Sequence, residues 1–149
     1  MTDEEYMMLA VFAAKQAASL DEVPVGALIV QDDRILASCY NLRENSKCAT
    51  HHAEILAIEE ACRILGGWRL PRCRMYVTLE PCPMCMGAII NARIDEVIFG
   101  AYDKRAGACG SLFDLQAFPL NHKTAVRGGV LEDTCSALLH EYFKEKRKK

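Results

Sequence analysis

The sequence predicts an α/β layered fold built around a mixed β-sheet. Segments with helical periodicity alternate with short apolar runs typical of buried strands, and a tight polar turn joins the first two runs. A length of 149 residues suits one ordinary domain, so we expect a single domain over residues 1–149. No internal repeat and no domain-sized linker interrupts the pattern.

The first predicted elements are a helix and a hairpin. Apolar residues recur at helical spacing over residues 3–20, and Pro24 ends this run. Residues 25–30 and 35–40 are short apolar runs on either side of the polar turn 31–34. This arrangement predicts two antiparallel strands.

The remaining elements alternate between helix and strand. Each predicted helix has apolar residues three to four apart, and each predicted strand is a short apolar run. Residues 102–120 are glycine-rich and mixed in character, which indicates a long loop of a kind that is often functional. The predicted helices cover residues 53–65, 83–92 and 132–148, and the predicted strands cover residues 74–78, 96–101 and 126–130.

The composition excludes several classes of protein. Hydrophobic residues make up 51% and charged residues 26% of the chain, which is typical of a globular protein and not of a disordered one. The net charge of -2 gives no overall sign of nucleic-acid binding, so such a function depends on a local basic patch. The sequence has no signal-peptide pattern, and no apolar run approaches the roughly 18 residues of a membrane helix. We therefore expect a cytoplasmic protein, without membrane contact, whose eight cysteines stay reduced.

Two cysteines lie at the start of a predicted helix, in Pro81-Cys82-Pro83-Met84-Cys85. Their sulfurs lie over the first helical turn, where unpaired backbone N–H groups and the helix dipole favour thiolates. Pro83 suits the first turn because no helical hydrogen bond is lost there. Taken alone, the motif leaves three alternatives open: half of a zinc site, a thioredoxin-like redox pair, or chance.

A histidine and a carboxylate lie at the start of the preceding predicted helix. His52 and Glu54 would diverge in the middle of a helix, but at its first turn both can project towards one point. We expect the two helices to follow adjacent parallel strands, so that their N-termini meet at one edge of the sheet. His52, Cys82 and Cys85 are then three ligands for one zinc ion per subunit. Three ligands leave a position open for water, which is the catalytic arrangement.

Glu54 lies close to this predicted metal without being one of its ligands. Zinc lowers the pKa of water from about 16 to roughly 7, and Glu54 can move a proton from the water to the ring nitrogen and the departing amine. His-x-Glu followed by Pro-Cys-x-x-Cys is the known signature of zinc nucleobase deaminases. The two motifs together predict hydrolytic deamination with Glu54 as the catalytic residue.

Beyond these motifs, the whole chain resembles the bacterial tRNA-specific adenosine deaminases of the cytidine deaminase superfamily. The resemblance includes residues 23–27, 76–80, 99–101, 110–115 and 121–122. It implies a three-layer α/β/α sandwich with a mixed central sheet, as in cytidine deaminase, and a homodimer. It also implies a hydrolase that converts the wobble adenosine of a tRNA anticodon to inosine, breaking an amidine C–N bond and releasing ammonia. His51 departs from the family pattern, and the spacing to Glu54 favours His52 as the ligand.

The same resemblance assigns roles to single residues. The predicted zinc ligands and Glu54 match the family's metal ligands and its proton shuttle. Asn41 resembles the asparagine that hydrogen-bonds the flipped base. Val25 and Leu79 resemble parts of the apolar wall beside that base, and Asp103 resembles a nucleotide-contacting residue.

The end of the chain supports a polynucleotide substrate independently. Five of the last six residues are basic in an otherwise acidic protein, and Phe143 beside them is available for stacking on a base. Phe143, Lys144, Lys146 and Arg147 are therefore candidates for binding a tRNA anticodon stem-loop. The alternative is a solvated helix end whose cations suit the C-terminal dipole.

The glycine-rich stretch at residues 107–111 suggests a phosphate cradle at first sight. It lacks the Lys-Ser/Thr ending and a clear following helix, so a flexible or tightly turned loop fits it better.

Three other functions fit parts of the sequence. A deaminase of a free base or nucleotide, such as guanine, cytosine or a cytidine nucleotide, shares the zinc chemistry but has no use for the basic tail. A thiol oxidoreductase uses Cys82 and Cys85 without a metal and leaves His52 and Glu54 unexplained. A zinc-stabilised RNA-binding module needs a fourth protein ligand and has no use for Glu54.

Overall fold

Helices and strands alternate along the chain in the computed structural model, which describes residues 1–148. The elements are α1 (Asp3–Ser19), β1 (Gly26–Gln31), β2 (Arg34–Tyr40), α2 (Ala53–Leu65), β3 (Cys73–Leu79), α3 (Pro83–Asn91), β4 (Glu96–Ala101), the short 3-10 helix η1 (Leu115–Ala117), β5 (Ala125–Arg127) and α4 (Glu132–Arg147). Among residues 1–148, no helix has both the length and the apolar character needed to cross a bilayer.

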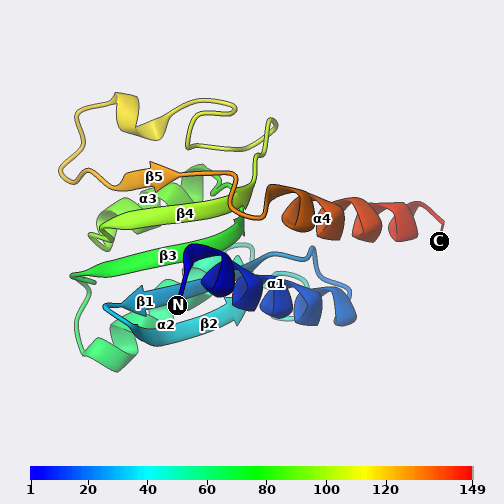
Figure 1. Ribbon diagram of the computed structural model, residues 1–149, viewed down its shortest axis with the longest axis horizontal. Coiled ribbons are helices and arrows are strands. Elements are labelled where there is room, and N and C mark those ends of the chain that lie inside the picture. The colour runs from blue at the N-terminus through cyan, green and yellow to red at the C-terminus, as the bar shows by residue number, and fades with distance from the viewer. Residues whose placement is uncertain (149) are drawn as a thin grey trace.

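The strands form one mixed sheet in the order β2-β1-β3-β4-β5. β1 is antiparallel to both β2 and β3, whereas the pairs β3–β4 and β4–β5 are parallel. α1 and α4 cover one face of the sheet, and α2 and α3 cover the other (Figure 1). The predicted three-layer α/β/α sandwich with a mixed sheet is confirmed.

Both faces of the central strands are buried, which explains their continuous apolar runs. On β1, Ala27 and Ile29 pack into the core beneath α2 and α3, whereas Leu28 and Val30 pack beneath α1 and α4. This alternation follows from the two-residue period of a strand. The apolar side chains of β1 therefore serve two separate cores.

Local signals place several boundaries where the sequence predicts them. α2 and β4 coincide with the predicted ranges 53–65 and 96–101. α2 ends at Gly66, which adopts the left-handed conformation with φ 72° that favours glycine at this position. α1 begins with a capping box, in which Thr2 and Glu5 accept hydrogen bonds from each other's backbone N–H groups.

The last strand is shorter and earlier than predicted. β5 ends at Arg127, whereas the apolar pattern predicts a strand over residues 126–130. Gly128 and Gly129 follow, and Gly129 has φ 90°, which is incompatible with an extended strand. The predicted loop over residues 102–120 lacks long elements and contains only η1.

Replacing Gly26 by Ala should destabilise the fold by about 1–3 kcal/mol, because the added methyl group has no space. A Cβ at Gly26 would overlap the carbonyl oxygen of Ala10 and lie 2.7 Å from the backbone nitrogen of Ala14, both in α1. Urea unfolding measures the free energy of unfolding. Gly67→Ala is the matched control, since nothing lies within 4 Å of its Cβ position. Equal stabilities of the two variants would contradict the close α1–β1 contact.

Candidate metal centre and substrate cavity

Two helix N-termini meet at one edge of the sheet. β2 and β3 run in the same direction because both are antiparallel to β1, so the helices that follow them begin at the same edge. His52 is the N-cap residue of α2, and Cys82 is the N-cap residue of α3. The expectation that these helices follow adjacent strands is wrong, since β1 lies between β2 and β3. The meeting of the helix ends is nevertheless as expected.

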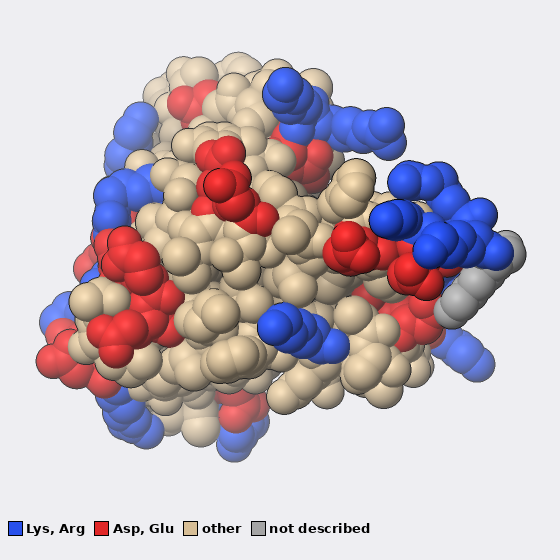
Figure 2. All heavy atoms as spheres, turned by 45° about the vertical axis from the view of Figure 1, so that its right-hand side comes forward, with Lys and Arg blue, Asp and Glu red and all other residues tan. Residues whose placement is uncertain are grey.

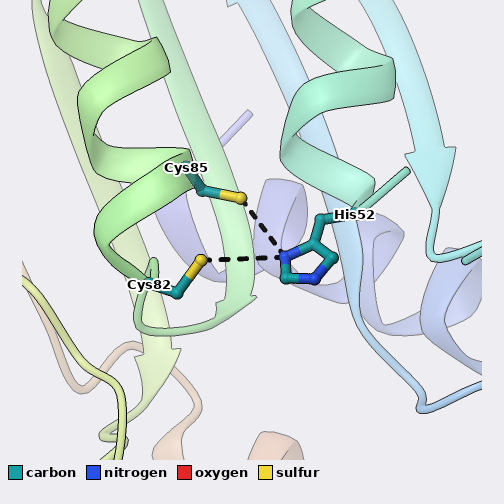
Figure 3. A group of neighbouring side chains, drawn as sticks. All are labelled: His52, Cys82 and Cys85. Atoms are coloured by element: carbon teal, nitrogen blue, oxygen red, sulfur yellow. Dashed lines mark hydrogen bonds between the residues drawn. The ribbon is translucent and has the colours of Figure 1, made fainter. Parts of the chain in front are cut away.

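His52, Cys82 and Cys85 point towards one another across this edge (Figure 3). The Nδ1 atom of His52 lies 3.7 Å from the sulfur of Cys82 and 3.5 Å from that of Cys85. All three potential ligand atoms lie within 4.8 Å of one another. One imidazole nitrogen and two sulfurs form a donor set that suits zinc and leaves a fourth coordination position open. The three side chains therefore fit a catalytic metal.

The neighbouring His51 is not part of this cluster. The cluster of potential ligands contains His52 alone of the two histidines. Nδ1 of His51 is buried and has no hydrogen-bond partner among residues 1–148. The geometry therefore agrees with the spacing argument that favours His52.

The cysteines of the cluster have strongly shifted pKa values. A hydrogen bond from Cys85, with a further contribution from His52, lowers the pKa of Cys82 to about 4. The same Cys82–Cys85 hydrogen bond, together with burial and the negative charge of Glu54, raises the pKa of Cys85. The hydrogen bond to Cys82 also raises the pKa of His52. A thiolate beside an imidazole is the electrostatic environment that a metal cation stabilises.

Glu54 lies in the first turn of α2, beside the cluster of His52, Cys82 and Cys85. Its side chain is buried, with 4% of its surface exposed, and it lines the cavity next to His52 and Cys82. Burial is the main cause that raises its pKa to about 7, and the negative charge of Cys82 adds to the effect. A carboxyl group with such a pKa can both accept and donate a proton near neutral pH.

A cavity of about 780 Å³ opens beside the cluster. His52, Glu54 and Cys82 are among the residues that line it. Its walls come from four parts of the chain: the segments 20–25 and 41–45, the end of β3 with part of the loop at 103–106, and α4. This volume lies within the range of small-molecule sites.

The family follows from comparison with known proteins. The MafB19-like deaminase family matches residues 1–147. A tRNA-specific adenosine deaminase of Bacillus subtilis (strain 168) is 47% identical over 148 residues, which span 99% of this chain and 92% of that protein. The chain belongs to the tRNA-specific adenosine deaminase family.

Solved structures of deaminases have the same fold. One, from a study of A-to-I editing by tRNA:A34 deaminases, has a TM-score of 0.88 at 40% identity and covers 91% of this chain and 99% of its own. A guanine deaminase of Bacillus subtilis has a TM-score of 0.68 at 31% identity and covers 100% of this chain and 96% of its own. The fold of this deaminase is thus more similar to the first of these two structures.

The substrate-binding residues predicted for the deaminase all line its cavity: Val25, Asn41, Leu79 and Asp103. Asn41 is buried, and its side-chain amide makes two hydrogen bonds within the chain. Its Nδ2 donates to the carbonyl of Val23 at 3.2 Å, and its Oδ1 accepts from Arg43 N–H at 3.1 Å. Oδ1 of Asp103 accepts from two backbone N–H groups of its own loop, those of Arg105 and Ala106. The structure therefore gives Asp103 a role in shaping the loop.

The predicted RNA-binding residues of α4 divide into two groups. Phe143 and Lys146 line the cavity, whereas Lys144 and Arg147 lie outside its lining. Lys146 pairs with Asp21 at 2.8 Å, and Tyr142 donates to the carbonyl oxygen of the same Asp21 at 3.2 Å. α4 is thus attached to the turn after α1. Lys149 of the basic tail lies outside the described residues.

Sequence reasoning missed two buried carboxylates and one aromatic residue in the cavity wall of the deaminase. Glu22 is 1% exposed and accepts from the N–H groups of Glu44 and Asn45, so it holds the loop after Asn41. Glu80 is 2% exposed and holds the opposite loop. Tyr142 is the aromatic residue. The sequence offers one signal for Glu80. It is a charged residue that lies between a predicted buried strand and Cys82.

Proposed function

We propose that this chain hydrolyses the wobble adenosine of a tRNA anticodon to inosine, with Glu54 as the catalytic residue. The observation that carries the proposal is the buried carboxylate of Glu54 beside the cluster of His52, Cys82 and Cys85, inside a substrate-sized cavity. The similarity to tRNA-specific adenosine deaminases over nearly the whole chain supports the choice of substrate.

His52, Cys82 and Cys85 would hold one zinc ion per subunit, which supplies Lewis-acid chemistry and hydroxide at neutral pH. Glu54 takes a proton from the attacking water and delivers it to the ring nitrogen of adenine as the oxygen adds to C6. The proton of the hydroxyl group now on C6 then passes through Glu54 to the exocyclic amine. The C6–N bond breaks as the C6 carbonyl forms, and ammonia leaves.

Asn41, Val25 and Leu79 would hold the flipped base in the cavity. One N–H of the Asn41 amide donates to Val23, and the second remains for a ring acceptor of the base. Val25 and Leu79 supply apolar surface on the walls. A base taken out of its stack is usually held in this way, by an amide and apolar side chains.

The basic end of α4 would contact the phosphates of the anticodon stem-loop. Figure 2 shows a group of Lys and Arg side chains at this end of the molecule, with acidic side chains beside them. Lys144, Lys146 and Arg147 are exposed there, and Phe143 and Lys146 also line the cavity. A stacking aromatic beside cations suits a single-stranded loop.

Replacing Lys144 and Arg147 by Ala should weaken tRNA binding and reduce its dependence on salt. The slope of log affinity against log salt should become shallower by about 0.7–0.9 for each phosphate that the variant no longer neutralises. Fluorescence anisotropy with a labelled anticodon stem-loop at several salt concentrations measures both quantities. Arg34→Ala is the control, because this exposed cation lies at the hairpin turn, at the opposite end of β2 from the cavity. Unchanged slopes would favour a merely solvated helix end.

We also propose that residues 1–149 act as a single deaminase domain in a homodimer, as the resemblance implies. A tRNA substrate would place the activity in the cytoplasm. Sedimentation equilibrium of the purified protein tests the dimer.

The decisive test of the function is inosine formation. Purified protein is incubated with a tRNA anticodon stem-loop and, in parallel, with free adenosine, cytidine and guanine. We expect inosine at the wobble position and no turnover of the free compounds. Deamination of guanine or cytidine without activity on the RNA would replace this proposal by a free-base or nucleoside deaminase, the alternative to which the similar guanine deaminase structure points.

A further inference from the structure

A second buried carboxylate lies two residues before the metal ligand Cys82. Glu80 follows β3, and its carboxylate accepts four hydrogen bonds from one loop. Oε1 accepts from Asp103 N–H at 3.1 Å and from the hydroxyl group of Ser111. Oε2 accepts from Cys109 N–H at 3.0 Å and from Ser111 N–H at 3.1 Å. Both oxygens are therefore fully used within the chain.

The glycine-rich stretch at residues 107–111 is shaped to receive this carboxylate. A Cβ on Gly107 would overlap the carboxylate of Glu80 and lie 2.5 Å from the carbonyl oxygen of Asp103. Gly110 has φ 129°, which L side chains rarely adopt. Backbone N–H groups gathered around an anion form a nest, and here the anion is a side chain of the protein itself. The stretch is thus an anion cradle that is already filled.

All hydrogen bonds to the Glu80 carboxylate come from this loop. Among residues 1–148, no Lys or Arg forms an ion pair with this carboxylate. A buried anion without hydrogen-bond donors is strongly unfavourable, so the loop and the carboxylate hold each other. A further hydrogen bond, from Ala108 N–H to the carbonyl oxygen of Pro81 at 2.9 Å, attaches the loop to the residue before Cys82.

The same loop forms one wall of the substrate cavity. Asp103 and Ala106 line the cavity on this side, and Glu80 itself lies at its edge. The position of this wall relative to the metal ligands is therefore set by the Glu80–Pro81 segment. Loss of the carboxylate would release the wall without removing any metal ligand.

We infer that Glu80 is a positioning residue for substrate recognition, which fixes residues 103–111 as a wall of the cavity. This inference rests on the proposed function. Variants that loosen the wall should bind substrate less well while the metal and the proton shuttle stay in place. The effect should appear in KM far more than in kcat.

Three variants and one control test the inference. Glu80→Gln keeps the shape but replaces one acceptor oxygen by a donor, Gly107→Ala displaces the carboxylate without altering it, and Ser111→Ala removes one side-chain donor. Gly67→Ala is the matched glycine control, with nothing within 4 Å of its added methyl group. Ser111→Ala is the mildest change and keeps the test available if the other variants fail to fold.

Hydrogen exchange of the backbone amides of Asp103, Cys109 and Ser111 is the first readout. We expect exchange roughly 10- to 100-fold faster in Glu80→Gln and Gly107→Ala, a smaller increase in Ser111→Ala, and none in the control. The second readout is KM and kcat on the anticodon stem-loop, with zinc content measured in parallel. We expect KM to rise about tenfold or more at nearly constant kcat and zinc content.

Unchanged exchange and unchanged KM in both strong variants would overturn the inference. Loss of zinc with a fall in kcat would also overturn it, since Glu80 would then support the metal site and not the wall. If the wild-type protein does not act on tRNA, the proposed function fails. The exchange readout needs no substrate, and it then decides alone whether Glu80 holds the loop.

Discussion

We expect replacement of Glu54 by Gln to suppress deamination of tRNA while zinc stays bound. The amide matches the carboxylate in shape and cannot take a proton from water, so kcat should fall by about 10²–10⁴. Glu54 is not among the three clustered ligands, so the metal content of the variant should equal that of the wild type. Inosine formation and metal analysis on the same preparation measure both effects.

Glu59→Gln is the matched control for this prediction. Glu59 lies on the same helix but is exposed to solvent and does not line the cavity. Its variant should keep full activity. Near-normal activity of Glu54→Gln would refute the proton shuttle, whereas loss of zinc from this variant would show that Glu54 supports the metal.

Replacement of Cys85 by Ala should remove zinc and, with it, the activity. Two ligands remain, and a site with one imidazole and one thiolate binds zinc far more weakly than a site with three donors. Metal content should fall from one zinc ion per chain to nearly none, and inosine formation should stop. Dialysis of the wild type against a chelator should have the same effect on activity, and added zinc should restore it.

Cys135→Ala is the control that distinguishes the loss of metal in Cys85→Ala from a loss of folding stability. Cys85 and Cys135 are both buried, at 0% and 1% exposure, so truncation removes a similar amount of packing from each core. Cys135 lies on α4 and belongs to the core on the other face of the sheet, which also contains residues of α1. It does not line the cavity. A variant of Cys135 should keep both zinc and activity. Full activity of Cys85→Ala without metal would instead favour a thiol-based reaction.

The elements of the fold could be predicted from local signals where such signals are strong. α2 has helical periodicity and ends at a glycine that stops it, and β4 is a clean apolar run, so both match their predicted ranges. β5 differs because its apolar pattern continues through Gly128 and Gly129, and the backbone of Gly129, with φ 90°, is not extended. The order of strands depends on pairing between distant segments, so the position of β1 between β2 and β3 had no local signal.

The candidate site also contains residues that could be predicted from the sequence and residues that could not. His52, Glu54, Cys82 and Cys85 could be predicted because their spacing within short motifs encodes their chemistry. Glu22 and Glu80 could not, because most of their hydrogen-bond donors are backbone N–H groups of loops 22–31 residues away, and backbone donors leave no trace in the residue types. The glycine-rich stretch at residues 107–111 can be identified as a filled anion cradle only from the position of the Glu80 carboxylate.

The attachment of α4 to Asp21 links two segments that are far apart in sequence. Lys146 contacts Asp21 across 125 positions, whereas the clustered residues His52, Cys82 and Cys85 all lie between residues 52 and 85. Because a ribosome makes the N-terminal segments first, these three residues emerge before the helix that closes the cavity. During synthesis all three residues of the His52, Cys82 and Cys85 cluster are therefore available before α4, which supplies the last wall of the cavity.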